Sequence, residues 1–221
     1  MRRTFATVAI GSIMAGTAFA QPDIVSREDW GAKPPIEKRV PALKNRAKGK
    51  RRVSAENVMP IRGDAKYLTV HHTARRASKR MLQRNLSSFQ SQMFGYTIDY
   101  GNGTTKKIYL GDIPYHYFID GAGRIAQGRQ LKYAAYSNTV YKTPIEQHIT
   151  VVLDGNFERS KPAASQVEAL TALLAHLAKT HDIDPENIGT HRDVAQTLCP
   201  GKNLAAQMDT IRAEVRARLG G

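Results

Sequence analysis

Residues 148–154, with the sequence HITVVLD, constrain the fold of this chain more than any other segment. The run consists almost entirely of apolar and β-branched residues and lacks the alternation of apolar and polar residues that is typical of a strand with one solvent-exposed face. It therefore predicts a central strand that is buried on both faces. Strands of this kind belong to sheets that are covered by helices, as in layered α/β proteins.

Three further segments have the composition of strands or hairpins. They are rich in β-branched and aromatic residues, and the sequences Gly-Asn-Gly and Gly-Ala-Gly mark turns within two of them. We expect a strand at residues 66–72 (KYLTVHH) and hairpins over residues 97–110 and 114–129.

Apolar residues at helical spacing predict helices over residues 78–94, 165–181 and about 204–219. The second of these is expected to begin with a capping box between Ser165 and Glu168. Because strands alternate with helices along the chain, the sequence predicts a single α/β domain with a central mixed β-sheet flanked by helices.

Residues 1–20 have the features of an export signal. Arg2 and Arg3 precede an uncharged, mostly apolar stretch, and Ala18 and Ala20 form an A-x-A cleavage pattern. The apolar stretch is shorter than the roughly 20 residues of a membrane-spanning helix. We therefore expect a mature protein that begins at Gln21 and is exported, to the periplasm or to the medium.

The mature chain is strongly basic. Loss of two arginines from 33 basic residues, against 19 acidic ones, leaves a formal charge of +12. Residues 38–52 form a basic arm with eight lysines or arginines and no acid, which is either a solvated connecting segment or an electrostatic tether to an anionic wall or membrane surface. Aromatic residues do not interleave with these charges, and export also argues against nucleic acid as a partner.

Cys199 is the only cysteine of a chain that is expected to enter an oxidising compartment. It is a buried small hydrophobe, an intermolecular disulfide partner, or a metal or catalytic ligand. His71 closes the strand at 66–72, and His191 and Cys199 bracket a short irregular stretch. Two imidazoles and a thiolate suit zinc with an open fourth position, although strand alternation does not choose between His71 and His72.

Five blocks of the sequence together resemble one family. They are VSREDWGAKPP (25–35), LTVHHTA (68–74), IPYHYFIDGAGRIAQGR (113–129), LDGNF (153–157) and THRDVAQTLCPG (190–201). In this order and spacing they resemble the zinc-dependent N-acetylmuramoyl-L-alanine amidases of the phage-lysozyme and peptidoglycan-recognition-protein type. The resemblance divides the chain into a signal peptide (1–20), an N-terminal extension with the basic arm (21–63) and an amidase domain (64–221).

The resemblance also implies a site. His71, His191 and Cys199 match the zinc ligands of the family, Tyr115 matches its active-site hydroxyl, and Thr197 matches a position beside the substrate carbonyl. The implied reaction is zinc-assisted hydrolysis of the amide between N-acetylmuramic acid and L-alanine, with peptidoglycan or muropeptides as substrate. The alternative is a protein of the same fold that binds peptidoglycan without cutting it.

The chain also departs from the family pattern. Some members place a glutamate base in the central strand, where this chain has Val152, and residues 97–112 lie outside the shared blocks. We interpret His72 as a neighbour of the site and Trp30 as an anchor of the N-terminal segment, and His116 as either a packing residue or a substrate contact. His148, His176 and His181 are expected to be surface or packing residues. No H-E-x-x-H helix is present to indicate a different zinc hydrolase.

Overall fold

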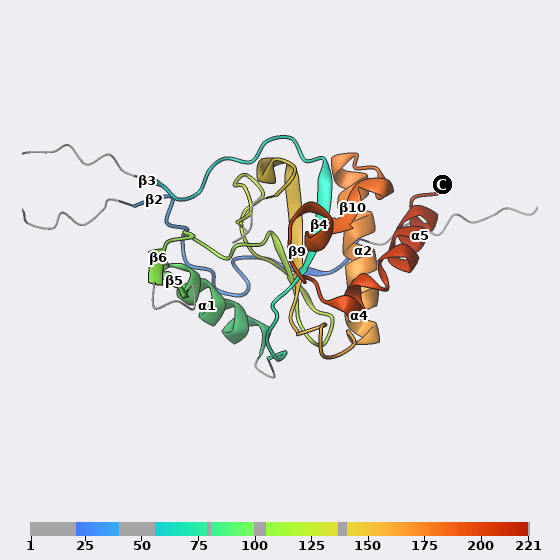
Figure 1. The fold of residues 1–221 in the computed structure, drawn as a ribbon, viewed down its shortest axis with the longest axis horizontal. Coiled ribbons are helices and arrows are strands. Elements are labelled where there is room, and N and C mark those ends of the chain that lie inside the picture. The colour runs from blue at the N-terminus through green and yellow to red at the C-terminus, as the bar shows by residue number, and fades with distance from the viewer. Residues whose placement is uncertain (1–20, 40–55, 79–80, 100–104, 137–140, 221) are drawn as a thin grey trace, which may run out of the picture.

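The computed structural model describes residues 21–39, 56–78, 81–99, 105–136 and 141–220 (Figure 1). The predicted signal peptide at residues 1–20 and residues 40–52 of the basic arm lie outside the described residues.

The centre of the fold is a mixed sheet of six strands. Its order is β1 (Ile24–Val25), β8 (Ile125–Gln127), β7 (Tyr117–Ile119), β9 (His148–Leu153), β4 (Tyr67–His72) and β10 (Ile188–Thr190). The β7–β8 pair is antiparallel and the other four pairs are parallel. The predictions of a mixed sheet, of a hairpin over residues 114–129 and of a central strand at 148–154 are confirmed.

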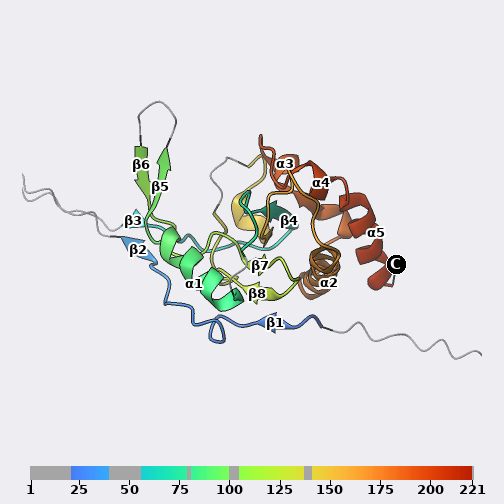
Figure 2. The same ribbon diagram turned by 90° about the horizontal axis from the view of Figure 1, so that it is seen from below.

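Helices cover both faces of this sheet (Figures 1 and 2). Helices α2 (Ala164–His181) and α5 (Met208–Arg218) pack on one face, and α1 (Leu82–Met93) packs on the other. Side chains of β9 alternate between the two layers, since Val151 and Leu153 join the α2 cluster and Val152 joins the α1 cluster. All six residues of β9 are buried, which explains why its sequence shows no polar alternation.

Short elements surround the sheet. The antiparallel pairs are β2 (Lys38–Arg39) with β3 (Glu56–Asn57) and β5 (Tyr96–Asp99) with β6 (Thr105–Ile108); the short helices are η1 (Ile145–Gln147), η2 (Pro185–Asn187), α3 (His191–Val194) and α4 (Lys202–Ala205). The predicted hairpin over residues 97–110 is therefore confirmed as β5–β6. It follows α1 and projects from the body of the molecule (Figure 2).

The predicted capping box of α2 is wrong. The helix begins at Ala164 with Ala163 as its N-cap, and the Gln166 side chain accepts a hydrogen bond from the Ala163 backbone N–H at 3.2 Å. Gln166 also donates to the Asp154 carbonyl at 3.1 Å, so the helix start is attached to the end of β9. Glu168 forms an ion pair with Arg218 at 2.7 Å instead of reaching back to the cap.

The predicted helix over residues 204–219 is in fact two helices. The chain leaves the helical path at Ala206 and Gln207, between α4 and α5, where Gln207 N–H donates to the Leu204 carbonyl three residues back. Leu204, Met208 and Ile211 nevertheless all join the α2 cluster. The apolar spacing therefore predicted the buried face correctly, but it could not locate the break.

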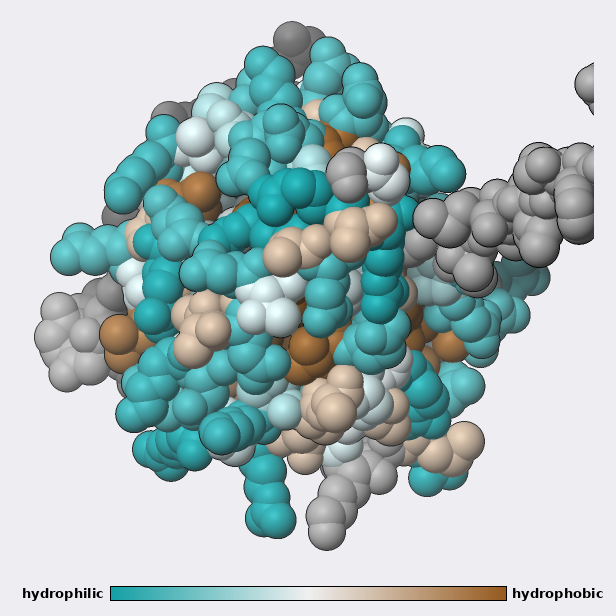
Figure 3. Space-filling view, turned by 90° about the vertical axis from the view of Figure 1, so that its right-hand side faces the viewer, coloured by the Kyte–Doolittle hydropathy of each residue, from teal (hydrophilic) through white to brown (hydrophobic). Residues whose placement is uncertain are grey.

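Hydrophilic residues cover most of the face that carries the C-terminal helices, and apolar residues there form small separate patches (Figure 3). Ion pairs here include Arg212–Asp209 within α5 and Arg218–Glu168 between α5 and α2. In the described part of the chain, no helix combines the length and the hydropathy needed to cross a membrane.

Candidate functional site

The parallel pairing of β4 with β10 brings His71 and His191 together. In this register Thr190 lies opposite Val70, so the next residues, His191 and His71, reach the same edge of the sheet. The two imidazole ring centroids are 4.5 Å apart. Asp193 fixes the turn into α3, because its Oδ2 accepts hydrogen bonds from Thr190 N at 2.7 Å and from Thr190 Oγ1 at 2.9 Å.

Cys199 reaches the same point from the loop after α3. Its Sγ lies 3.7 Å from His71 Nδ1 and accepts a hydrogen bond from His72 N at 3.4 Å. The loop passes very close to the 157–158 backbone: a Cβ on Gly201 would lie 2.3 Å from Glu158 N, and Gly201 has φ +90°. The last position of the Cys-Pro-Gly sequence can therefore be occupied without strain only by glycine.

These three residues form a compact set of possible metal ligands. One ligand atom each from His71, His191 and Cys199 lies within 4.8 Å of the other two. Tetrahedral zinc with bonds of about 2.0–2.3 Å needs ligand atoms about 3.3–3.8 Å apart, which the Sγ to Nδ1 distance already satisfies. The donor set, its burial and its spacing all fit a zinc ion.

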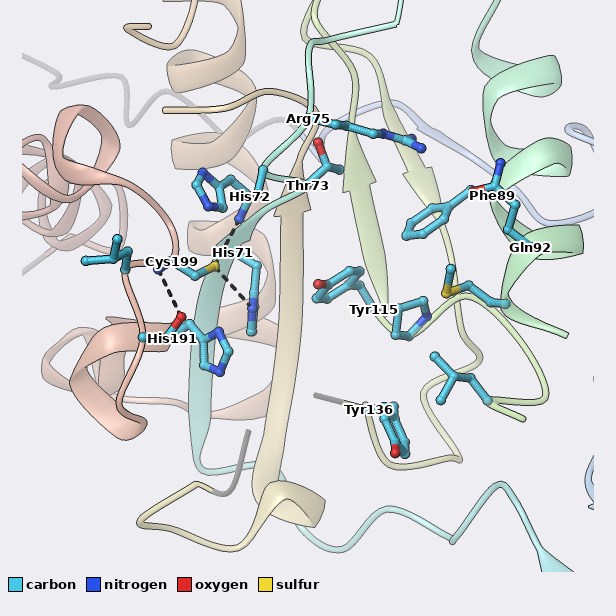
Figure 4. A pocket seen from close by; sticks show the side chains of 16 residues that line it. His71, His72, Thr73, Arg75, Phe89, Gln92, Tyr115, Tyr136, His191 and Cys199 are labelled. Carbon is cyan, nitrogen blue, oxygen red and sulfur yellow. Dashed lines mark hydrogen bonds between the residues drawn. The ribbon is translucent and has the colours of Figure 1, made fainter. Parts of the chain in front are cut away.

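Strand alternation separates His71 from His72. His71 lies on the α1 side of the sheet and is 1 % exposed, whereas His72 lies on the α2 side, where its Nδ1 accepts a hydrogen bond from Phe157 N at 3.2 Å. His72 therefore supports the site through its backbone, which holds the Cys199 sulfur (Figure 4).

Burial sets the protonation of the three side chains. It lowers the pKa of His71 well below its ordinary value, and the neighbouring His191 and His148 lower it further. Burial also lowers the pKa of His191 to about 4 and raises that of the Cys199 thiol to about 12. At neutral pH and without a metal, the site therefore holds two neutral imidazoles and a protonated thiol.

The three side chains lie at one end of a groove of about 500 Å³ (Figure 4). Tyr115 and Thr197 also line this groove, and the Tyr115 ring centroid is 5.0 Å from that of His71. Arg129 holds the Tyr115 backbone, since Arg129 N–H donates to the Tyr115 carbonyl at 2.7 Å. The rest of the lining is largely apolar or aromatic, with Phe89, Met93, Leu110, Pro114 and Tyr136.

No carboxylate lines the groove among the residues that the structure describes. Val152 is the β9 partner of His71, is fully buried and packs in the α1 cluster. Its side chain therefore offers no general base next to the histidine pair.

The structure resolves the two readings of His116 in favour of packing. It is 1 % exposed, its Nε2 is bonded to the Tyr133 carbonyl at 2.9 Å, and its Nδ1 accepts from Thr150 N at 3.0 Å. The interpretation of Trp30 is confirmed, because its buried indole donates to the Gln127 carbonyl at 2.7 Å and attaches the N-terminal segment to β8.

Comparison with known proteins agrees with this fold. A family model described as N-acetylmuramoyl-L-alanine amidase matches residues 61–202, which is more than half of the chain. The chain belongs to this amidase family.

The chain is also similar to peptidoglycan-recognition proteins. It is 28% identical over 213 residues to peptidoglycan-recognition protein SD of Drosophila simulans, covering 89% of this chain and 92% of that protein. The structure of human PGRP-IβC in complex with glycosamyl muramyl pentapeptide matches with a TM-score of 0.61, 23% identity and coverage of 86% and 96%. A mutant of Drosophila PGRP-LB in complex with tracheal cytotoxin matches with a TM-score of 0.59, 23% identity and coverage of 85% and 93%. At these identities the two structures show a shared fold.

Tyr141 is a further residue of the candidate site that the sequence did not reveal. Its hydroxyl lies 2.9 Å from His71 Nε2, and its ring meets the edge of the His148 ring at a centroid distance of 4.9 Å. His148 is held in turn by Thr69 Oγ1 at 2.7 Å and Thr143 Oγ1 at 2.8 Å. Tyr141 lies in an irregular segment without a motif, so only the folded chain shows its contact with His71.

Proposed function

We propose that this protein is a zinc-dependent N-acetylmuramoyl-L-alanine amidase, which hydrolyses the amide between N-acetylmuramic acid and the L-alanine of the stem peptide. The convergence of His71, His191 and Cys199 at one end of a groove carries this proposal. Membership of the amidase family supports it, and the two similar structures with muropeptide ligands support a peptidoglycan fragment as the substrate.

The three side chains can act as ligands without rearrangement of the sheet. A zinc ion bound by them would polarise the scissile carbonyl and lower the pKa of the attacking water. For His71 to offer Nδ1 to the metal, its Nε2 must carry the proton, and this proton is then donated to the Tyr141 oxygen. The hydrogen bond orients the imidazole toward Cys199.

Tyr115 and Thr197 are proposed to stabilise the carbonyl oxygen as it gains negative charge. Thr197 Oγ1 accepts a hydrogen bond from Cys199 N at 3.2 Å, which leaves its O–H available as a donor. Tyr115 presents its ring on the opposite side of His71 from the Cys199 loop (Figure 4). Fixed donors of this kind contribute about 3–4 kcal/mol each in favourable cases.

The organisation of the chain is part of the proposal. Residues 1–20 act as a signal peptide, residues 21–63 form an N-terminal extension with the basic arm, and residues 64–221 form the amidase domain. The mature protein is exported, to the periplasm or the medium. Its basic arm at residues 38–52 contacts an anionic wall or membrane surface.

The decisive experiment incubates the zinc-loaded protein with purified peptidoglycan and identifies the released products by mass spectrometry. We expect free stem peptides with a new L-alanine amino terminus and uncut glycan strands, and no release by the Cys199→Ser variant. New reducing ends would indicate a glycosidase, and cleavage within the stem peptide would indicate a peptidase. Binding of peptidoglycan without any release would favour the non-catalytic recognition protein.

A further inference from the structure

A lip of the groove, residues 73–78, is fixed by a buried carboxylate. Asp154 follows β9 and is fully buried. It accepts hydrogen bonds from Thr73 Oγ1 at 3.0 Å, Arg75 Nε at 3.3 Å, Ser78 N at 2.8 Å and Asn85 Nδ2 at 3.2 Å. Because Asn85 belongs to α1, this carboxylate joins the lip to the helix on the groove side of the sheet.

Arg75 lines the groove from this lip and has a fixed orientation (Figure 4). Its Nη2 donates to Asn85 Oδ1 at 3.2 Å, and its Cζ lies 5.1 Å from the centre of the Phe89 ring. The side chain is 37% exposed, and Nη1 has no hydrogen-bond partner in the described part of the chain. A guanidinium held on two sides in this way loses little freedom when it binds a ligand.

Arg75 forms an ion pair with Asp154 through its Nε atom. Asp154 contacts it through a single long hydrogen bond and is also satisfied by three uncharged donors. Among the described lining residues there is no Asp or Glu, and Arg75 is the one Lys or Arg. Because Asp154 itself does not line the groove, Arg75 is the one formally charged Lys, Arg, Asp or Glu side chain that a ligand meets in the described lining.

We propose that Arg75 determines specificity by binding a free carboxylate of the stem peptide. This inference rests on the proposed function, in which the scissile amide lies at the His71, His191 and Cys199 end and the peptide extends along the groove. The flat guanidinium matches a carboxylate in shape and charge, whereas a carboxamide offers less charge and competing N–H groups. Arg75 would then favour stem peptides that keep this carboxylate over those in which it is amidated.

The test uses two muropeptides that differ only in this group, one with the free carboxylate and one with the carboxamide. Binding is measured by calorimetry and hydrolysis by mass spectrometry, for the zinc-loaded wild type and for Arg75→Gln. Arg76→Gln is the matched control: it removes the same charge from the next residue, which is exposed and lines a different cavity with Asn156 and Arg159. Arg75→Lys keeps the positive charge but lacks the planar pair of N–H groups of the guanidinium. Melting curves show whether each variant is folded.

We expect the wild type to bind the carboxylate muropeptide about tenfold more tightly than the carboxamide, the ratio typical of a charged hydrogen bond. Arg75→Gln should lose this preference, Arg75→Lys should keep part of it, and Arg76→Gln should keep all of it. Because the wild-type ratio needs no variant, a folding defect in Arg75→Gln leaves the test intact.

The outcomes separate the two proposals. Product formation with equal kcat/KM on both muropeptides overturns the role of Arg75 and leaves the amidase proposal standing. Selective binding of the carboxylate without any product supports Arg75 and overturns the amidase. Equal losses in Arg75→Gln and Arg76→Gln would reduce the effect to general electrostatics, and absence of binding to either muropeptide would overturn both proposals.

Discussion

Replacement of Tyr141 by phenylalanine tests whether the groups around His71 contribute to metal affinity. The change removes one oxygen, 2.9 Å from His71 Nε2, and leaves the ring that packs against His191 and His148. A single buried hydrogen bond contributes about 0.5–1.5 kcal/mol, and loss of a partner that orients a ligand typically lowers metal affinity by about 10- to 100-fold. Because the ring stays and the ligands are untouched, we expect the lower end, about tenfold weaker zinc binding.

The assay is a competition titration of the metal-free protein with a chromophoric chelator, followed by melting curves with and without zinc. The stabilisation by zinc should shrink in Tyr141→Phe, while the metal-free melting temperature changes little. Tyr136→Phe is the matched control, since it removes the same atom from another tyrosine of the groove that makes no ring contact with His71 among the described residues. Equal zinc affinities for the wild type and Tyr141→Phe would refute the orienting role of this hydroxyl.

Four further results are expected. Tyr115→Phe should keep zinc and lose about 10²-fold in kcat; an unchanged kcat with a raised KM would make Tyr115 a binding residue. Zinc binding at pH 7 should release about one proton, because the pKa of Cys199 is raised to about 12 and that of His191 lowered to about 4, and calorimetry in buffers of different ionisation enthalpy measures it. Zero release would argue against a thiolate ligand. Burial lowers the pKa of His116 to about 3 and that of His148 to about 4, so the unfolded chain takes up protons before the folded protein does as the pH falls below about 6.5. The urea concentration at the unfolding midpoint of the metal-free protein should therefore decrease from pH 7 toward pH 4. A midpoint that does not change with pH would contradict this. Deletion of residues 40–52 should weaken co-sedimentation with intact cell wall, most visibly at low salt, but spare hydrolysis of a soluble muropeptide. Equal loss on both substrates would show instead that the arm is part of the fold or of the active site.

The layers of the fold could be predicted because burial leaves a direct trace in the sequence. The continuous apolar run at residues 148–153 became the central strand, and the spacing of Leu204, Met208 and Ile211 marked a buried face. The same patterns did not predict where helices begin or break when these positions depend on hydrogen bonds to residues far away in the chain. The start of α2 is set by Gln166 bonding to the Asp154 carbonyl, and no local signal at Ser165 could compete with that contact.

The site could be predicted in part for the same reason. His71, His191 and Cys199 belong to recognisable sequence blocks, so the resemblance to the family identifies them, and the structure brings their ligand atoms within 4.8 Å of one another. Tyr141 and Arg75 carry no such mark. Their positions beside His71 and Phe89 follow from the packing of separate segments, which a single sequence does not specify.

Parallel strands explain why these parts meet at one place. His71 is the fifth residue of β4, Asp154 follows the last residue of β9, and His191 follows the last residue of β10. Because these three neighbours run parallel, their carboxyl ends lie at one edge of the sheet, where ligands of open α/β sheets usually bind. β9 contributes an apolar Val152 beside His71 and then a carboxylate that fixes the lip bearing Arg75. The edge thus carries His71, His191 and Cys199 at a point where no carboxylate lines the groove among the described residues, and it carries Arg75 on the lip that Asp154 fixes. The register of β4 and β9 sets the separation between the two groups.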